Sequence, residues 1–138
     1  MSSSYRPSML SHQTGLSVTA STAGTFYAIG SAISVPRNGI AVISMAGHVS
    51  GSYGYIQLKL TRGSNTFTFG GSDSLFNNGS VSYIGATSST PLTTDYNTYY
   101  NNLPLILPVY GGDSLQFYAS NSGLNDITYI DDLLVMLI

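Results

Sequence analysis

Hydrophobic and polar residues alternate with a period of two along much of the chain. The alternation is clearest in one short segment, in which apolar side chains are separated by polar ones: Ile56, Gln57, Leu58, Lys59 and Leu60. Successive side chains of a β-strand point to opposite faces, so the pattern predicts a strand with its apolar side on a core and Gln57 and Lys59 in water. Residues 66–69 and 114–119 alternate in the same way.

Two further segments, 40–46 and 133–138, are largely apolar on both faces. A strand of this kind is covered on both sides. The sequence leaves two explanations open. Either these are central strands buried within the domain, or one face of each contacts a partner subunit.

Turn-forming residues separate the apolar segments. Arg62-Gly63-Ser64-Asn65 predicts a hairpin between 58–61 and 66–69. No segment repeats apolar residues at the helical spacing. We therefore predict strands only, at residues 15–21, 25–35, 39–50, 54–62, 65–70, 80–87, 103–109, 113–120 and 126–138.

These elements predict an all-β fold, an antiparallel two-sheet jelly-roll sandwich of about eight to ten strands. The sandwich domain is expected to span 14–138. Residues 1–13 are rich in Ser and lack a clear period, and we interpret them as an extended N-terminal arm. The arm is expected to reach onto a neighbouring subunit through its larger side chains, which are Tyr5, Arg6, Met9 and Leu10.

Three stretches of the chain resemble the family of complement globular-head and tumour-necrosis-factor-like domains. The first is a strand pair, made of Gly39-Ile40-Ala41-Val42-Ile43-Ser44, His48-Val49 and Tyr55-Ile56-Gln57-Leu58-Lys59-Leu60-Thr61-Arg62-Gly63. The second is the corner Leu107-Pro108-Val109-Tyr110-Gly111-Gly112-Asp113-Ser114-Leu115-Gln116-Phe117-Tyr118, and the third is the final apolar strand 130–138. In the corner, Gly permits a tight turn and Asp accepts backbone N–H bonds. The resemblance implies a ten-stranded jelly roll that forms a trimer around a three-fold axis.

Composition excludes several functions. Charged residues make up only 7% of the chain and the net charge is −2, which does not provide the basic surface that nucleic-acid binding requires. Cysteine is absent, and no apolar run reaches the ~20 residues of a membrane span. The N-terminal residues have no apolar segment behind them, so we expect no secretion signal.

The sequence gives no motif for catalysis or for a metal. The chain has two histidines, His12 and His48, and no Glu, so the H-E-x-x-H motif is missing, as is G-x-S-x-G. We interpret His48 as an ordinary strand residue. Asp131 and Asp132 are adjacent in a predicted strand, so we expect them to point to opposite faces and not to act together. Turn aspartates could supply calcium ligands, but more often they accept backbone N–H bonds. We therefore predict no enzyme activity, no cofactor and no metal.

Residues 86–102 form a long polar connection without a period. Loops of this length tend to be functional or disordered. Tyr- and Asn-rich loops suit adaptable recognition, so this loop is a candidate partner- or ligand-binding site through Tyr96, Asn97, Tyr99 and Tyr100. The alternative is that these tyrosines pack over the edge of the sandwich.

Two functions follow as hypotheses. The first is a non-enzymatic structural subunit of a virion (capsid-associated, turret or spike protein) that binds copies of itself, with a trimer favoured, and other virion proteins. It would assemble in the host cytoplasm. Jelly rolls are common in viral capsids, and a surface with so little charge is better covered in an assembly. The alternative is a module that binds a host surface glycan or a receptor through residues 86–102.

Overall fold

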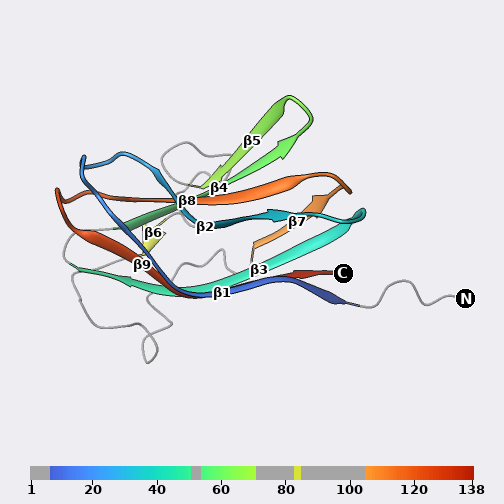
Figure 1. The fold of residues 1–138 in the computed structure, drawn as a ribbon, viewed down its shortest axis with the longest axis horizontal. Coiled ribbons are helices and arrows are strands. Elements are labelled where there is room, and N and C mark those ends of the chain that lie inside the picture. Colours follow the sequence, from blue (N-terminus) through green and yellow to red (C-terminus); the bar gives the residue numbers. More distant parts are fainter. Residues whose placement is uncertain (1–6, 51–53, 71–82, 85–104) are drawn as a thin grey trace, which may run out of the picture.

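Two antiparallel β-sheets, packed face to face, make up the computed structural model, which describes residues 7–50, 54–70, 83–84 and 105–138 (Figure 1). The first sheet has the order β1-β9-β3-β7, formed by Ser8–Thr19 (β1), Ile127–Leu137 (β9), Gly39–Val49 (β3) and Leu105–Val109 (β7). The second has the order β2-β8-β4-β5, formed by Tyr27–Ser34 (β2), Ser114–Asn121 (β8), Gly54–Arg62 (β4) and Asn65–Gly70 (β5). The short strand Tyr83–Ile84 (β6) pairs with β4.

The chain crosses between the two sheets at most of its connections. Strands β1, β3, β7 and β9 belong to the first sheet, and the strands that follow β1, β3 and β7 belong to the second. The predicted hairpin joins β4 to β5, with Arg62 paired to Asn65. Two antiparallel sheets connected in this way form a jelly roll, which confirms the predicted all-β fold class. From β2 onward, each described strand lies within its predicted segment or extends it by one residue.

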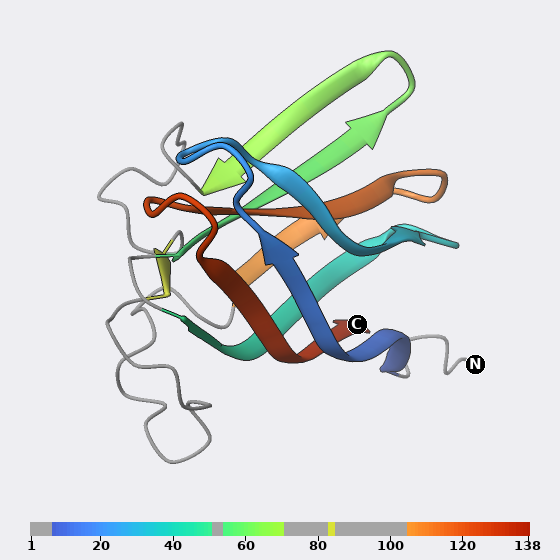
Figure 2. The ribbon, with the colours of Figure 1, turned by 60° about the vertical axis from the view of Figure 1, so that its left-hand side comes forward.

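Strand β1 differs from its prediction, because it begins at Ser8 and includes residues 8–13 of the segment interpreted as an arm. Its backbone pairs with β9 from Ser8 opposite Leu137 to Thr19 opposite Ile127 (Figure 2). The register shifts between Met9 and Ser11, and Leu10 packs against the core. This irregularity interrupts the two-residue alternation, which is why the sequence pattern does not reveal a strand here.

The side chain of Gln13 connects β1 to the edge of the second sheet. Its Oε1 accepts a hydrogen bond from the Ser31 backbone N–H at 2.8 Å, and its Nε2 donates to the Ser31 carbonyl at 3.3 Å. Gly30 adopts a φ of +76°, and a Cβ at this position would lie 2.7 Å from Gln13 Oε1. Glycine at position 30 therefore permits this contact between the two sheets.

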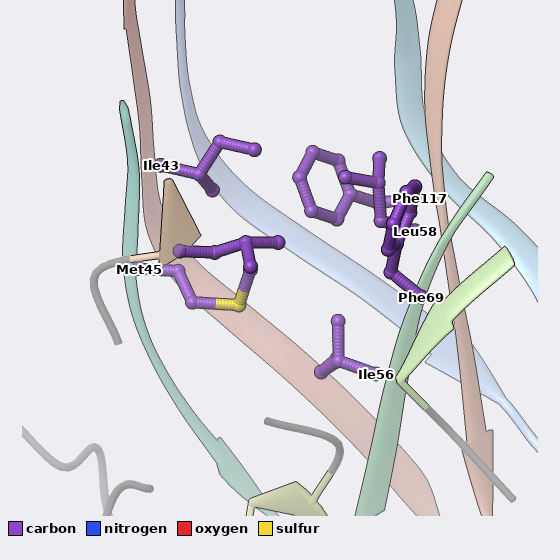
Figure 3. A pocket seen from close by; sticks show the side chains of 7 residues that line it. Ile43, Met45, Ile56, Leu58, Phe69 and Phe117 are labelled. Carbon is purple, nitrogen blue, oxygen red and sulfur yellow. The ribbon is translucent and has the colours of Figure 1, made fainter. Parts of the chain in front are cut away.

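The core lies between the sheets and is entirely apolar at its centre. Figure 3 shows Ile43 and Met45 of β3 opposite Leu58 of β4 and Phe117 of β8. The alternation in β4 is confirmed for its apolar residues, since Ile56, Leu58 and Leu60 are all buried. Gln57 is an exception to the predicted water-facing side, because it is only 6% exposed. It lies on an inner strand with Tyr118 of β8 paired beside it, and these neighbours reduce its contact with water.

The predicted glycine–aspartate corner connects β7 to β8. Gly112 has a φ of +95°, which suits glycine, and Asp113 is 2% exposed. Asp113 accepts hydrogen bonds from Arg62 Nε at 2.9 Å, from Arg62 Nη2 at 2.8 Å and from the Tyr110 backbone N–H at 2.7 Å. The Arg62 guanidinium, assisted by this N–H, holds the pKa of Asp113 below its usual value, although burial opposes the shift.

The core packing predicts a large difference between two leucine-to-alanine variants. Leu115 is 0% exposed in β8, whereas Leu124 is 62% exposed. Leu115→Ala leaves a cavity between the sheets and should lower the free energy of unfolding by about 2–5 kcal/mol. Leu124→Ala should change it by less than about 0.5 kcal/mol. Urea denaturation measures both, and equal effects would contradict the described packing.

The Arg62–Asp113 contact at the corner should stabilise the fold at neutral pH, and acid should remove this contribution to the free energy of unfolding. Because the pKa of Asp113 is lower in the folded state, its ionised form stabilises the fold above the unfolded-state value of about 3.9, and this contribution is lost as the pH falls further. Asp113→Asn should cost about 1.5–3 kcal/mol at pH 7 and much less at pH 2.5.

The matched control for the corner is Asp132→Asn, which removes a half-exposed carboxylate. It should change the free energy of unfolding by no more than about 1 kcal/mol at pH 7. Denaturation of the three proteins between pH 7 and pH 2.5 measures the effect. A loss for Asp113→Asn that is constant over this range would show that the ionised carboxylate is not the stabilising group.

Candidate functional site

The outer face of the first sheet, meaning the side chains of β1, β9, β3 and β7 that point away from the second sheet, carries a continuous row of apolar residues. Met9 pairs with Met136, Met136 with Val42, and Val42 with Ile106, so that each strand contributes one member. Met9 is 60% exposed and Ile106 is 61% exposed, while Val42 and Met136 between them are half-buried. We call these four residues the apolar row.

More apolar surface lies next to the apolar row. Ile40 is 38% exposed and Ile138 is 47% exposed. Their backbones are joined by a pair of hydrogen bonds of 3.0 and 2.9 Å, and Pro108 is the partner of Ile40 on β7. Of the large hydrophobic side chains that are exposed among the described residues, four belong to this face: Met9, Ile40, Ile106 and Ile138. Exposed apolar residues that gather in this way indicate an interaction surface.

A β-bulge in β9 changes the other end of the outer face. Ala46 pairs with Asp132 and Gly47 with Ile130, so Asp131 has no partner in the β3–β9 register. Ile130 and Leu133 are both fully buried, and the two aspartates between them both point outward. The expectation that Asp131 and Asp132 point to opposite faces is therefore wrong. The bulge inserts one residue and removes the alternation on which that expectation depends.

Each aspartate is hydrogen-bonded to a histidine of a neighbouring strand. Asp132 Oδ1 lies 2.6 Å from His12 Nε2 of β1, and Asp131 Oδ2 lies 2.8 Å from His48 Nδ1 of β3. The first pair is half-exposed, with side-chain exposures of 55% for Asp132 and 47% for His12. In the second pair, His48 is 9% exposed and Asp131 is 27% exposed.

The ring of Tyr129 covers His48. The two ring centroids are 4.2 Å apart and the planes differ by 5°, which is a stacked arrangement. His48 does lie in a strand, as predicted, but its partners make it part of a cluster. Both histidines of the chain thus meet two adjacent carboxylates on one face of one sheet.

A His–Asp pair can belong to a nucleophilic triad or to a metal centre, and each of these sites needs further groups. An Asp-oriented imidazole is one component of a nucleophilic triad, but neither imidazole is hydrogen-bonded to a serine hydroxyl of a described residue. Within the same residues, no group of three or more His, Asp or Glu side chains is arranged to hold a metal ion. We therefore describe the pairs as ionisable groups on the outer face of the first sheet.

The described residues form one hollow on the outer face of the first sheet and another between the two sheets. An open depression of about 260 Å³ on the outer face is lined by Ser44, Met45, Ala46, Asp132 and Leu134. An apolar cavity of about 20 Å³ lies between the sheets, lined by the side chains that Figure 3 shows. The inner cavity has room for about one water molecule, and its lining side chains are all apolar, so we interpret it as a packing defect.

The structure tests only part of the predicted binding residues. Tyr96, Asn97, Tyr99 and Tyr100 lie outside the described residues, as do Tyr5 and Arg6. Of the remaining two, Met9 belongs to the apolar row, while Leu10 turns toward the core.

Sequence reasoning missed the two His–Asp pairs, although β9 contains a signal for them. The buried positions of β9 are Thr128 and Ile130 before the bulge, and Leu133, Val135 and Leu137 after it. The inward residues therefore change from even to odd numbers at the two aspartates. A shift of phase in the apolar pattern, occurring at two charged residues, indicates a bulge that places both on the polar side.

No helix among the described residues is long and apolar enough to cross a membrane. No family model, curated protein or solved structure matches the chain.

Proposed function

We propose that the chain is a non-enzymatic structural subunit that self-assembles through the outer face of the sheet β1-β9-β3-β7. The observation that carries the proposal is the apolar row, which crosses all four strands and leaves Met9 and Ile106 about 60% exposed. Burial of such a row in water-free contact contributes about 25 cal/mol for each Å² of apolar surface.

The size of the outer face suits a stable interface. The four strands have 12, 11, 11 and 5 residues. About 3.3 Å of length for each residue and about 4.8 Å of width for each strand give a face of roughly 600 Å². Each partner of a standard protein–protein interface buries about 800 Å². Contact with a second copy over the whole of this face therefore approaches the area of a standard interface.

The occupant we propose is a second copy of this chain. None of the four strands carries Lys or Arg, and their acidic residues are hydrogen-bonded to histidines of the same face. The face thus combines apolar area with groups that both donate and accept hydrogen bonds, which suits contact with another copy of the chain. The resemblance to complement globular-head and tumour-necrosis-factor-like domains supports a closed trimer.

The setting we propose for this assembly is a virion, in a shell, turret or spike, where the chain also contacts other virion proteins after assembly in the host cytoplasm. The support is the jelly-roll fold, which viral capsids use widely, together with a charged fraction of only 7%. The alternative, a glycan- or receptor-binding module, is favoured by the Tyr- and Asn-rich sequence of residues 86–102, which lie outside the described residues.

A charge in the apolar row should break the assembly. Ile106→Glu places a carboxylate at a 61% exposed position of β7, where the isolated subunit tolerates it but an apolar contact does not. The native mass of the full chain, measured by light scattering, should be that of a trimer or larger closed ring, and the variant should be monomeric at the same concentration.

The matched control is Leu124→Glu, which makes the same change at a position that is 62% exposed but lies in the turn before β9. This variant should keep the native mass of the unmodified chain. A monomeric unmodified chain would contradict the proposal, and so would assembly that survives in Ile106→Glu.

A further inference from the structure

We propose that the two His–Asp pairs make self-assembly pH-dependent, so that acidification from pH 7.5 to pH 5.5 tightens it. The inference rests on the proposed function, because it concerns the same outer face. The bulge brings both histidines of the chain and two of its six aspartates together there. Histidine is the side chain whose charge ordinarily changes between pH 5 and 8.

The charge of the face follows from its titratable groups. β1 contributes His12, β3 contributes His48, and β9 contributes Tyr129, Asp131 and Asp132, while β7 contributes none. With both imidazoles neutral, the two carboxylates give the face a charge of −2. With both imidazoles protonated, the charges cancel and the face is neutral.

No basic side chain of the four strands compensates the carboxylates at neutral pH. Arg37 precedes β3 and donates hydrogen bonds to Asn38 O and Ser8 Oγ, close to the apolar row. Lys59 and Arg62 belong to β4 of the second sheet. The carboxylates therefore depend on His12 and His48 for neutralisation.

The charge of the outer face affects the strength of association when two copies come into contact. In the free subunit, water screens the charges of the half-exposed His12–Asp132 pair, so their interaction contributes little there. In an assembly, the same groups face those of another copy in a drier environment, where uncompensated carboxylates repel one another and are costly to desolvate. Association therefore favours the protonated imidazoles and takes up protons, and an equilibrium that takes up protons is stronger at low pH.

The direct experiment is sedimentation equilibrium of the full chain at pH 7.5 and pH 5.5, at one fixed low ionic strength. One linked proton changes an equilibrium constant about tenfold for each pH unit. The dissociation constant of the assembly should therefore fall about tenfold or more between the two pH values. Added salt should reduce this difference, because the groups involved are partly exposed charges.

Charge-neutral variants test the assignment to these pairs. The double variant Asp131→Asn, Asp132→Asn removes the charge of −2, so its assembly should be as tight at pH 7.5 as that of the unmodified chain at pH 5.5. Asp126→Asn is the matched control, since it removes one carboxylate just outside β9. It should keep the full pH response.

A single substitution provides a second test that does not depend on the folding of the double variant. His12→Gln changes a side chain that is 47% exposed and should keep the fold. It removes one of the two titrating imidazoles, so the change of the dissociation constant with pH should be about half as large on a logarithmic scale.

The outcomes separate this inference from the proposed function. Assembly that is equally strong at both pH values, or weaker at pH 5.5, and that is still broken by Ile106→Glu, would overturn the pH dependence while supporting the assembly face. A pH response that persists fully in His12→Gln and in the double aspartate variant would also overturn it. A monomer at both pH values would overturn the proposed function itself.

Discussion

The architecture depends on β9, which is hydrogen-bonded along both edges. It lies between β1, which begins the described chain, and β3, and it buries Leu133, Val135 and Leu137 completely against the second sheet. An apolar strand near a chain end would otherwise leave unpaired backbone groups and exposed apolar side chains. With both edges paired, the outward side chains of β9 are held in fixed register with those of its neighbours. Both the apolar row and the two His–Asp pairs depend on this register.

The chain has few charged residues, and its ion pairs are of two kinds, one at a corner between strands and the other on the face of a sheet. The bidentate contact of Arg62 with Asp113 is at a corner, with the carboxylate buried, and it stabilises the turn between sheets. The His12–Asp132 and His48–Asp131 pairs lie on a sheet face and leave at least one partner partly exposed. Arginine and aspartate are both charged at neutral pH, so the Arg62–Asp113 pair is an ion pair there. Histidine is the residue type whose charge ordinarily changes between pH 5 and 8. The fold thus uses arginine for structure and histidine at the surface where we propose contact.

The fold class and most strand positions among the described residues could be predicted from the sequence, because alternation and turn residues act locally. The hairpin at Arg62–Asn65 and the acceptor role of Asp113 both follow from residue type and spacing. The candidate site could not be predicted in the same way. The bulge at Asp131 and the irregularity at Leu10 each insert one residue, and such an insertion reverses which face every later side chain occupies. The meeting of His12 with Asp132 also needs β1 and β9, at opposite ends of the chain, to pair in one register.

The contact of Gln13 with Ser31 has a consequence for how copies of the protein can join. A glutamine amide carries one acceptor and one donor, as a peptide unit does, and it occupies both the N–H and the carbonyl of Ser31. At this residue, β2 is thereby closed to strand addition, the route by which β-proteins polymerise into open-ended fibres. The Gln13 side chain thus occupies the two backbone groups of Ser31 that a neighbouring strand would otherwise bind.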